Sequence, residues 1–125
     1  MGMNKIMKVV LSEEANEQVA KLNNVVGNEI SRGITSSENQ TLLRSLQRVF
    51  GLLKSNPFGG IQIKKSLILM KYVKNQDVSN LWKFDLPNYW RMIYTVRGNE
   101  VEIISFILDI IDHKTYDKIF GYRKK

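Results

Sequence analysis

Apolar residues recur along the first half of the chain with the spacing of two helices. In the first set they lie three or four positions apart, at Ala15, Val19, Leu22, Val26 and Ile30, which places them on one face of an amphipathic helix. The second set has the same spacing and comprises Leu42, Leu43, Leu46, Val49, Phe50 and Leu53. Ser12 and Ser37 are suited to cap the two helix starts, while Gly33 and Pro57 favour their ends. The pattern predicts a helical hairpin, preceded by a short strand over Lys5–Leu11.

The second half is organised around residues 81–122, where three apolar runs are followed by a short helix. Pro87-Asn88 separates the first two runs and Gly98-Asn99 separates the next two, and these are residues that favour tight turns. We therefore expect three consecutive antiparallel strands, of which the second and third carry apolar side chains on both faces. Asp112 is a suitable cap for the final helix. Upstream, residues 61–63 alternate only briefly, and Leu67–Val73 fits a helical turn or an edge strand equally well.

These elements predict one α+β domain over residues 1–125. An N-terminal strand and the helical hairpin pack on a twisted, mainly antiparallel sheet of about four strands, and a short C-terminal helix follows. The absence of cysteine and the single histidine disfavour disulfides and transition-metal sites, so no metal and no cofactor is expected. The longest uncharged apolar-rich run, Ile103–Leu108, is far shorter than the roughly 20 residues of a membrane span. A cytoplasmic location is expected.

Positive charge is concentrated in the second half of the chain. The formal net charge is +7, and residues 63–125 contain 12 basic and 7 acidic side chains. A basic surface attracts polyanions, so RNA, DNA or an acidic protein are possible partners. The alternative is that the charge serves solubility alone.

Two groups of residues are candidates for chemistry. Arg91 stands in an apolar strand, where a guanidinium is either paired or directed at a ligand. A three-residue turn would set it opposite Asp85 in a salt bridge, and the other interpretation is a planar fork that binds phosphate. In the last helix His113, Tyr116 and Phe120 fall on one face, so that an imidazole suited to acid–base chemistry lies beside a phenol. The alternative is an exposed His113 above a Tyr116 that packs with Phe120.

The stretches LWKFDLPNYWRMIYTV and EVEIISFILDIIDHKTYDKIF resemble the RelE/ParE superfamily of toxin proteins, and they most resemble its archaeal members with a longer middle connection. The specific part is Leu81–Phe120, with a W-K-x-x-L strand, a [WY]-R-x-x-Y strand and the sequence DHKxYDK. The resemblance implies a RelE-like fold with a basic concave sheet face. RelE-like toxins are metal-independent endoribonucleases that cut mRNA in the ribosomal A site, whereas ParE-like relatives inhibit DNA gyrase. Both are neutralised by an antitoxin, often acidic, that is encoded beside them.

By this resemblance, Lys83 and Arg91 would stabilise charge on a phosphate attacked by the RNA 2′-OH, and His113 or Tyr116 would move the proton. Further RNA contacts are expected from the cationic residues Lys64, Lys65, Lys114, Arg123 and Lys124. Asp85 departs from the family pattern, because the RelE members that the chain most resembles have a second lysine there. The expected function is that of an mRNA-cleaving toxin. The alternative is a binding module, either a gyrase inhibitor or a protein that only binds RNA or its partner.

Overall fold

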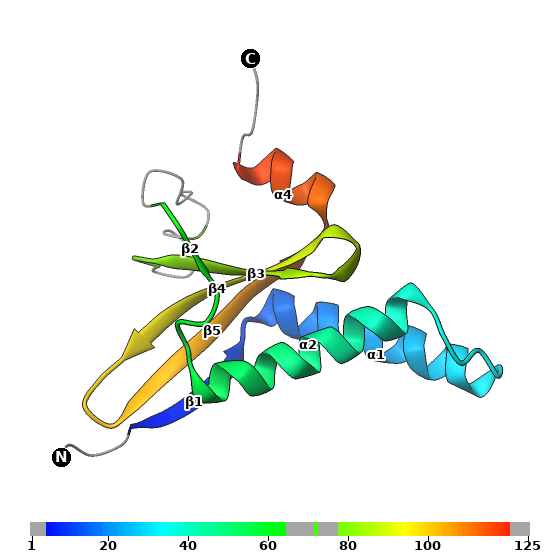
Figure 1. Ribbon diagram of the computed structural model, residues 1–125, viewed down its shortest axis with the longest axis horizontal. Helices are drawn as coiled ribbons and strands as arrows, with labels where there is room; N and C mark the ends of the chain where they lie inside the picture. The colour runs from blue at the N-terminus through cyan, green and yellow to red at the C-terminus, as the bar shows by residue number, and fades with distance from the viewer. Residues whose placement is uncertain (1–4, 65–71, 73–77, 121–125) are drawn as a thin grey trace.

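A five-stranded mixed sheet forms the centre of the computed structural model, which describes residues 5–64, 72 and 78–120 (Figure 1). The elements in chain order are β1 (Ile6–Leu11), α1 (Glu13–Ser31), α2 (Glu38–Ser55), β2 (Ile61–Ile63), β3 (Leu81–Leu86), the 3-10 turn η2 (Pro87–Tyr89), β4 (Trp90–Gly98), β5 (Glu102–Ile111) and α4 (His113–Phe120). The strand order is β1-β5-β4-β3-β2, in which β1 is parallel to β5 and the other pairs are antiparallel. The α+β class and the order of the predicted elements are confirmed.

Side chains at the start of α1 join this helix to the sheet. Ser12 Oγ accepts a hydrogen bond from Ala15 N, as an N-cap does, and donates one to Leu108 O at 2.8 Å. One turn further, Gln18 Oε1 accepts from Ile110 N at 2.9 Å. These bonds satisfy backbone groups of β5 beyond the point where β1 ends, because buried N–H and C=O groups need partners.

A buried acid holds the two helices of the hairpin together. Glu29 accepts hydrogen bonds from Asn39 Nδ2 at 2.9 Å, Ser37 Oγ at 2.5 Å and Gln40 Nε2 at 3.1 Å. These bonds, chiefly those from Asn39 and Ser37, lower the pKa of Glu29 because they favour the charged carboxylate. Gly33, with a φ of 81°, makes the left-handed turn that ends α1. The predicted capping serine Ser37 accepts from Gln40 N and is confirmed.

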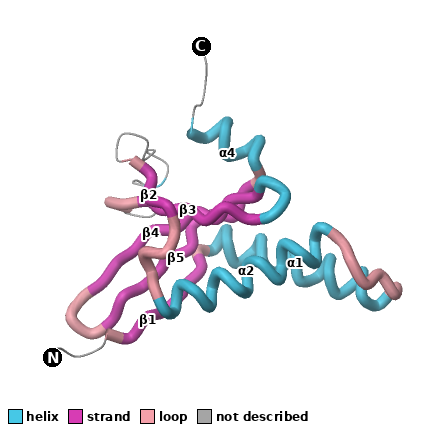
Figure 2. The backbone as a smooth tube through the Cα atoms, in the orientation of Figure 1, coloured by secondary structure: helices cyan, strands magenta, loops and turns pink. Residues whose placement is uncertain are grey.

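The sheet is covered on both faces, as the apolar second and third runs predicted. On the hairpin side, α1 and α2 pack against a core that includes Leu46, Leu53, Leu86, Met92, Tyr94 and Ile107. On the opposite side, α4 packs against a second core that includes Tyr72, Leu81, Ile93, Leu108, Tyr116 and Phe120. The helices lie on the two sides of the strands in Figure 2. The sheet is therefore an inner layer, and polar side chains on its α4 side are partly buried.

The expected number of strands in the sheet is corrected. The sheet has five strands rather than about four, because Ile61–Ile63 pairs with β3 as β2; this strand is too short to show a clear alternation in sequence. The predicted segment Leu67–Val73 lies outside the described residues except for Tyr72. Among the described residues, no helix has the length and apolar character needed to cross a membrane.

Candidate functional site

Three charged side chains meet on the α4 side of the sheet, near the β3–β4 turn. The turn Pro87–Tyr89 sets Asp85 directly opposite Arg91, and Lys83 lies two residues before Asp85 on the same face. Asp85 Oδ1 lies 2.8 Å from Lys83 Nζ and 3.0 Å from Arg91 Nε. The register expected for a three-residue turn and the Asp85–Arg91 ion pair are confirmed. One carboxylate oxygen thus forms ion pairs with two cations from neighbouring strands.

The two cations lie over an aromatic ring supplied by α4. The Tyr116 ring centroid is 5.6 Å from Lys83 Nζ and 5.4 Å from Arg91 Cζ, within the range of cation–π attraction. The Lys83 and Arg91 side chains are only 18% and 15% exposed, whereas that of Asp85 is 51% exposed. We refer to Lys83, Asp85, Arg91 and Tyr116 as the cation cluster. Its cations are ordered by the protein, while the anion between them faces solvent.

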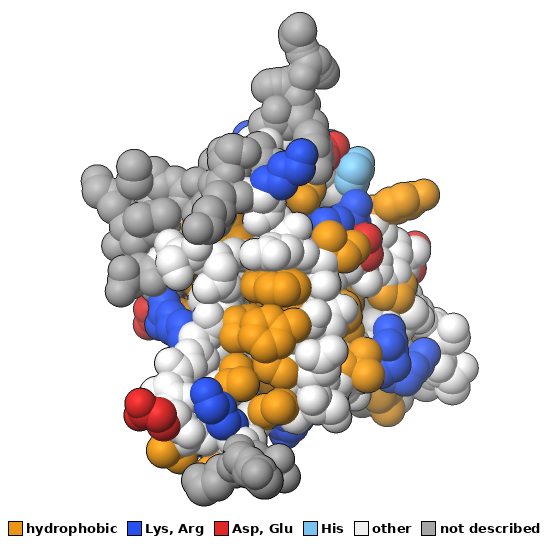
Figure 3. Space-filling view, turned by 60° about the vertical axis from the view of Figure 1, so that its left-hand side comes forward, with side chains coloured by type: hydrophobic (Ala, Val, Ile, Leu, Met, Phe, Trp, Pro, Cys, Tyr) orange, Lys and Arg blue, Asp and Glu red, His pale blue; other side chains and the backbone are white. Residues whose placement is uncertain are grey.

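His113 lies three residues before Tyr116 in α4 and contacts groups outside the cation cluster. Asp112 caps α4 through a 2.8 Å hydrogen bond from Thr115 N, so His113 is the first helical residue, as predicted. Its side chain is 53% exposed, with Nε2 at 3.1 Å from Asp117 Oδ2. The ring centroid of Tyr89 is 5.8 Å away. Figure 3 shows the single histidine, in pale blue, among Lys or Arg and Asp or Glu side chains.

The structure shows the alternative interpretation of α4, in which His113 is exposed and Tyr116 packs with Phe120. Tyr116 is 4% exposed and packs on Phe120 with ring centroids 4.6 Å apart. The helix turns Tyr116 toward the sheet and leaves His113 at the surface, because a short amphipathic helix buries its apolar face. Of the two predicted acid–base residues, His113 is therefore the one that a ligand in solvent can reach.

Sequence reasoning missed a buried polar pair on the same side of the sheet. Tyr72 donates a 2.9 Å hydrogen bond to Asp109 Oδ2, and both side chains are buried. Burial raises the pKa of the Tyr72 phenol, and the Asp109 carboxylate and the Tyr116 phenol raise it further. The sequence did contain one indication of this pair, because Asp109 is an acid within the otherwise apolar run of β5.

A surface hollow adjoins the cation cluster at the β3–β4 turn. Its volume is about 520 Å³, and it is lined by Asp85, Leu86, Asn88, Tyr89 and Arg91.

Within the described part of the chain, no group of three or more potential metal ligands is present.

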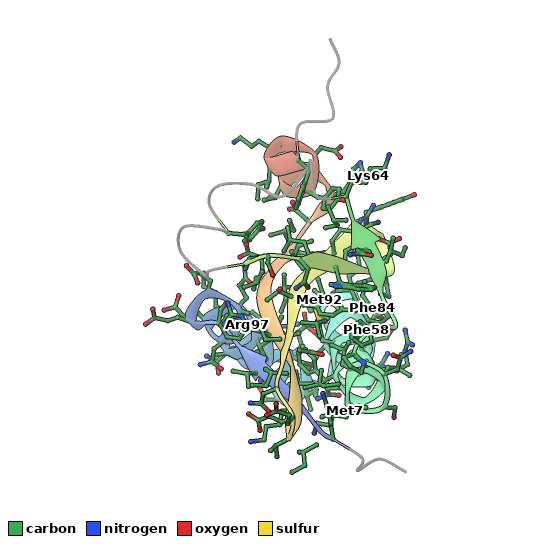
Figure 4. The ribbon with its side chains drawn as sticks, turned by 90° about the vertical axis from the view of Figure 1, so that its left-hand side faces the viewer. Met7, Phe58, Lys64, Phe84, Met92 and Arg97 are labelled. Atoms are coloured by element: carbon green, nitrogen blue, oxygen red, sulfur yellow. The ribbon has the colours of Figure 1, made fainter. Side chains whose placement is uncertain are left out.

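Of the cations predicted as further RNA contacts, the structure describes only Lys64 and Lys114. Lys114, in the first turn of α4, and Lys64 are exposed. Lys64 lies at the end of β2 away from Phe58 (Figure 4). Lys65, Arg123 and Lys124 lie outside the described residues.

Comparison with family models, with curated proteins and with solved structures finds no match for this chain.

Proposed function

We propose that this protein is a RelE-like toxin that binds RNA at the cation cluster and cleaves mRNA on the ribosome without a metal ion. The observation that supports this proposal is the convergence of Lys83 and Arg91 on one solvent-exposed oxygen, Asp85 Oδ1. Two cations that share an anionic oxygen are arranged as a phosphate oxygen requires. Their low exposure and the Tyr116 ring hold them in this position before any ligand arrives, and such preorganisation favours transition-state charge.

The proposed reaction is a phosphodiester transfer within the RNA. The 2′-oxygen attacks the adjacent phosphorus, the bond to the 5′-oxygen of the next nucleotide breaks, and a 2′,3′-cyclic phosphate forms. His113 takes the proton from the 2′-OH, and a proton from solvent or from the same group reaches the leaving 5′-oxygen. Arg91 and Lys83 bind the phosphoryl oxygens as negative charge builds on them. Tyr116 has a supporting role in this scheme, because its side chain is buried under the cations.

The Asp85 carboxylate favours a second candidate function. Its Oδ1 contacts both Lys83 Nζ and Arg91 Nε, the two groups that we propose bind phosphate. A ligand therefore has to displace it, or bind beside it. If Asp85 stays in place, the protein is a binding module that does not cut RNA, such as a ParE-like gyrase inhibitor. In either case we propose a cytoplasmic protein whose net charge of +7 suits an acidic antitoxin.

The deciding experiment measures a defined mRNA in a translating extract with wild type and with Arg91→Ala and His113→Ala. The proposal expects wild type to cut the mRNA and each variant to be slower by about 10²–10⁴-fold, with an unchanged circular dichroism spectrum. Arg97→Ala is the matched control, because Arg97 is also an arginine of β4 but packs over Phe106 at 5.0 Å. It should cut as wild type does.

Three results would decide against this assignment. Intact mRNA with wild type, together with blocked DNA supercoiling by gyrase, would identify the ParE-like alternative. Intact mRNA and unaffected gyrase would leave a binding protein. An Arg91→Ala variant that unfolds would show that the Asp85–Arg91 pair is chiefly structural.

A further inference from the structure

Tyr89 has an unusual backbone conformation at the edge of the cation cluster. Its φ is 65°, and that of the preceding Asn88 is 59°. Asparagine adopts the left-handed region readily, but a bulky aromatic residue does so rarely and with strain. Strained residues persist where the surrounding structure enforces them, and they are enriched at functional sites. Here the paired strands β3 and β4 enforce the turn from both sides.

The Tyr89 side chain contributes little to the folded core. It is 72% exposed, the highest value among the exposed large hydrophobic residues that the structure describes. Burial of a side chain can offset the cost of a strained backbone, but the Tyr89 side chain is exposed and gives no such compensation. Glycine or asparagine would fit the turn better. The fold alone gives no reason for tyrosine at this position.

The surroundings of Tyr89 do give a reason. Its ring lies 5.8 Å from the His113 ring at an interplanar angle of 51°. Tyr89 also lines the hollow of about 520 Å³ together with Asp85, Leu86, Asn88 and Arg91. The exposed Tyr89 ring thus lies near the His113 imidazole and lines the same hollow as the Arg91 guanidinium. These are the groups needed for a base, a phosphate and a proton transfer.

We propose that this hollow is a nucleobase subsite in which an unpaired RNA base stacks on Tyr89 while its phosphate lies at Arg91. The subsite rests on the proposed function for its ligand, single-stranded RNA. Stacking on an aromatic side chain binds bases of any sequence, and the Asn88 side chain, as donor and acceptor, is suited to a base edge. By fixing the base, Tyr89 determines which phosphate faces His113.

The test measures binding of a 2′-O-methyl single-stranded RNA oligonucleotide by fluorescence anisotropy. This RNA lacks the attacking 2′-OH, so binding is separated from cleavage. The variant is Tyr89→Gly, which removes the ring and also relieves the positive φ. We expect its dissociation constant to rise roughly fivefold to a hundredfold, while its melting temperature stays the same or increases. Tyr89→Phe keeps the ring and should bind as wild type does.

Phe58→Ala is the matched control. Phe58 is another exposed aromatic residue, at 52%, but it contacts Trp82 on the hairpin side of the sheet. In Figure 4 it lies near Phe84 and away from α4. This variant should bind RNA as wild type does. Equal losses for Phe58→Ala and Tyr89→Gly would indicate general hydrophobic attraction and overturn the subsite.

The outcomes separate the subsite from the proposed activity. If wild type binds the 2′-O-methyl RNA through Tyr89 but leaves unmodified mRNA intact, the subsite stands and the proposed cleavage fails. If wild type cuts mRNA and Tyr89→Gly binds and cuts equally well, cleavage stands and the subsite is overturned. Absence of any binding by wild type also overturns the subsite.

Discussion

Asp85 and Arg91 face each other across the β3–β4 pair, with Arg91 Nε 3.0 Å from Asp85 Oδ1. The same oxygen lies 2.8 Å from Lys83 Nζ, so the carboxylate neutralises part of the charge that a polyanion would meet. Asp85 is half-exposed, while both cations are largely buried. Replacing the Asp85 carboxylate should therefore change the surface that a ligand meets more than it changes the core. Asp85 is therefore expected to control the affinity of the site.

Replacing Asp85 by asparagine should strengthen RNA binding. The change removes one negative charge between two ordered cations, and we expect roughly a fivefold gain in affinity at low salt. The slope of log affinity against log salt should steepen by about one unit, because one more phosphate contact releases counterions. Anisotropy with the 2′-O-methyl RNA at about 50 and 200 mM salt measures both quantities.

Glu102→Gln is the control for this substitution. It removes the same charge from another ion pair, in which Glu102 lies 3.0 Å from Lys8 near the start of β5. Equal effects of the two variants would show that net charge alone governs binding. Weaker binding by Asp85→Asn would show that the carboxylate orders the cations rather than competing with RNA.

The capping residue of α4 should make the stability depend on pH. Hydrogen bonds from the Thr115 side chain and backbone lower the pKa of Asp112. A carboxyl whose pKa is lowered by folding stabilises the protein above its ordinary pKa, and this contribution is lost as the pH falls through the folded-state value. Asp112→Ala should cost about 1 kcal/mol at pH 7. Urea unfolding at pH 7 and near pH 3 should show the difference from wild type shrinking in acid. A constant difference would contradict the assignment.

Two glycines should respond in opposite directions to alanine. A Cβ at Gly60 would lie 2.6 Å from Lys83 O and 2.7 Å from Tyr94 Oη, and Tyr94 is a buried residue. Gly60→Ala should therefore destabilise the protein by about 1–3 kcal/mol. A Cβ at Gly51, within α2, meets nothing within 4 Å, so Gly51→Ala should stabilise it by up to about 1 kcal/mol. Thermal unfolding of both variants checks the prediction. Equal shifts in one direction would refute it.

Removal of the Tyr72 hydroxyl should weaken the core on the α4 side of the sheet. Tyr72→Phe deprives the buried Asp109 of the 2.9 Å hydrogen bond, and we expect a loss of about 1–2 kcal/mol in the free energy of unfolding. Tyr89→Phe is the matched control, since the Tyr89 side chain is exposed, and should change it by less than about 0.5 kcal/mol. Similar losses for both variants, measured by denaturant unfolding, would argue against a special role for the buried pair.

The chain's local patterns determined its elements. The apolar spacing of residues 15–53, the capping serines Ser12 and Ser37, and Gly33 predicted the hairpin that the structure shows. The turn at Pro87-Asn88 predicted the pairing of Asp85 with Arg91, which is confirmed. These features depend on residues close in sequence, where backbone preference and helical or strand periodicity act directly.

Tertiary packing decided which side chains share a surface. Along β5, alternation from Ile107 would put Asp109 on the hairpin side, but a bulge opposite Ile93/Tyr94 shifts it to the α4 side, where it meets Tyr72. In the same way, burial of Tyr116 and exposure of His113 depend on how α4 docks on the sheet. Such contacts join residues far apart in the chain, as in the pairing of Ile6 with Glu102. Sequence periodicity carries no information about a bulge or a docking angle, because packing against distant elements sets both.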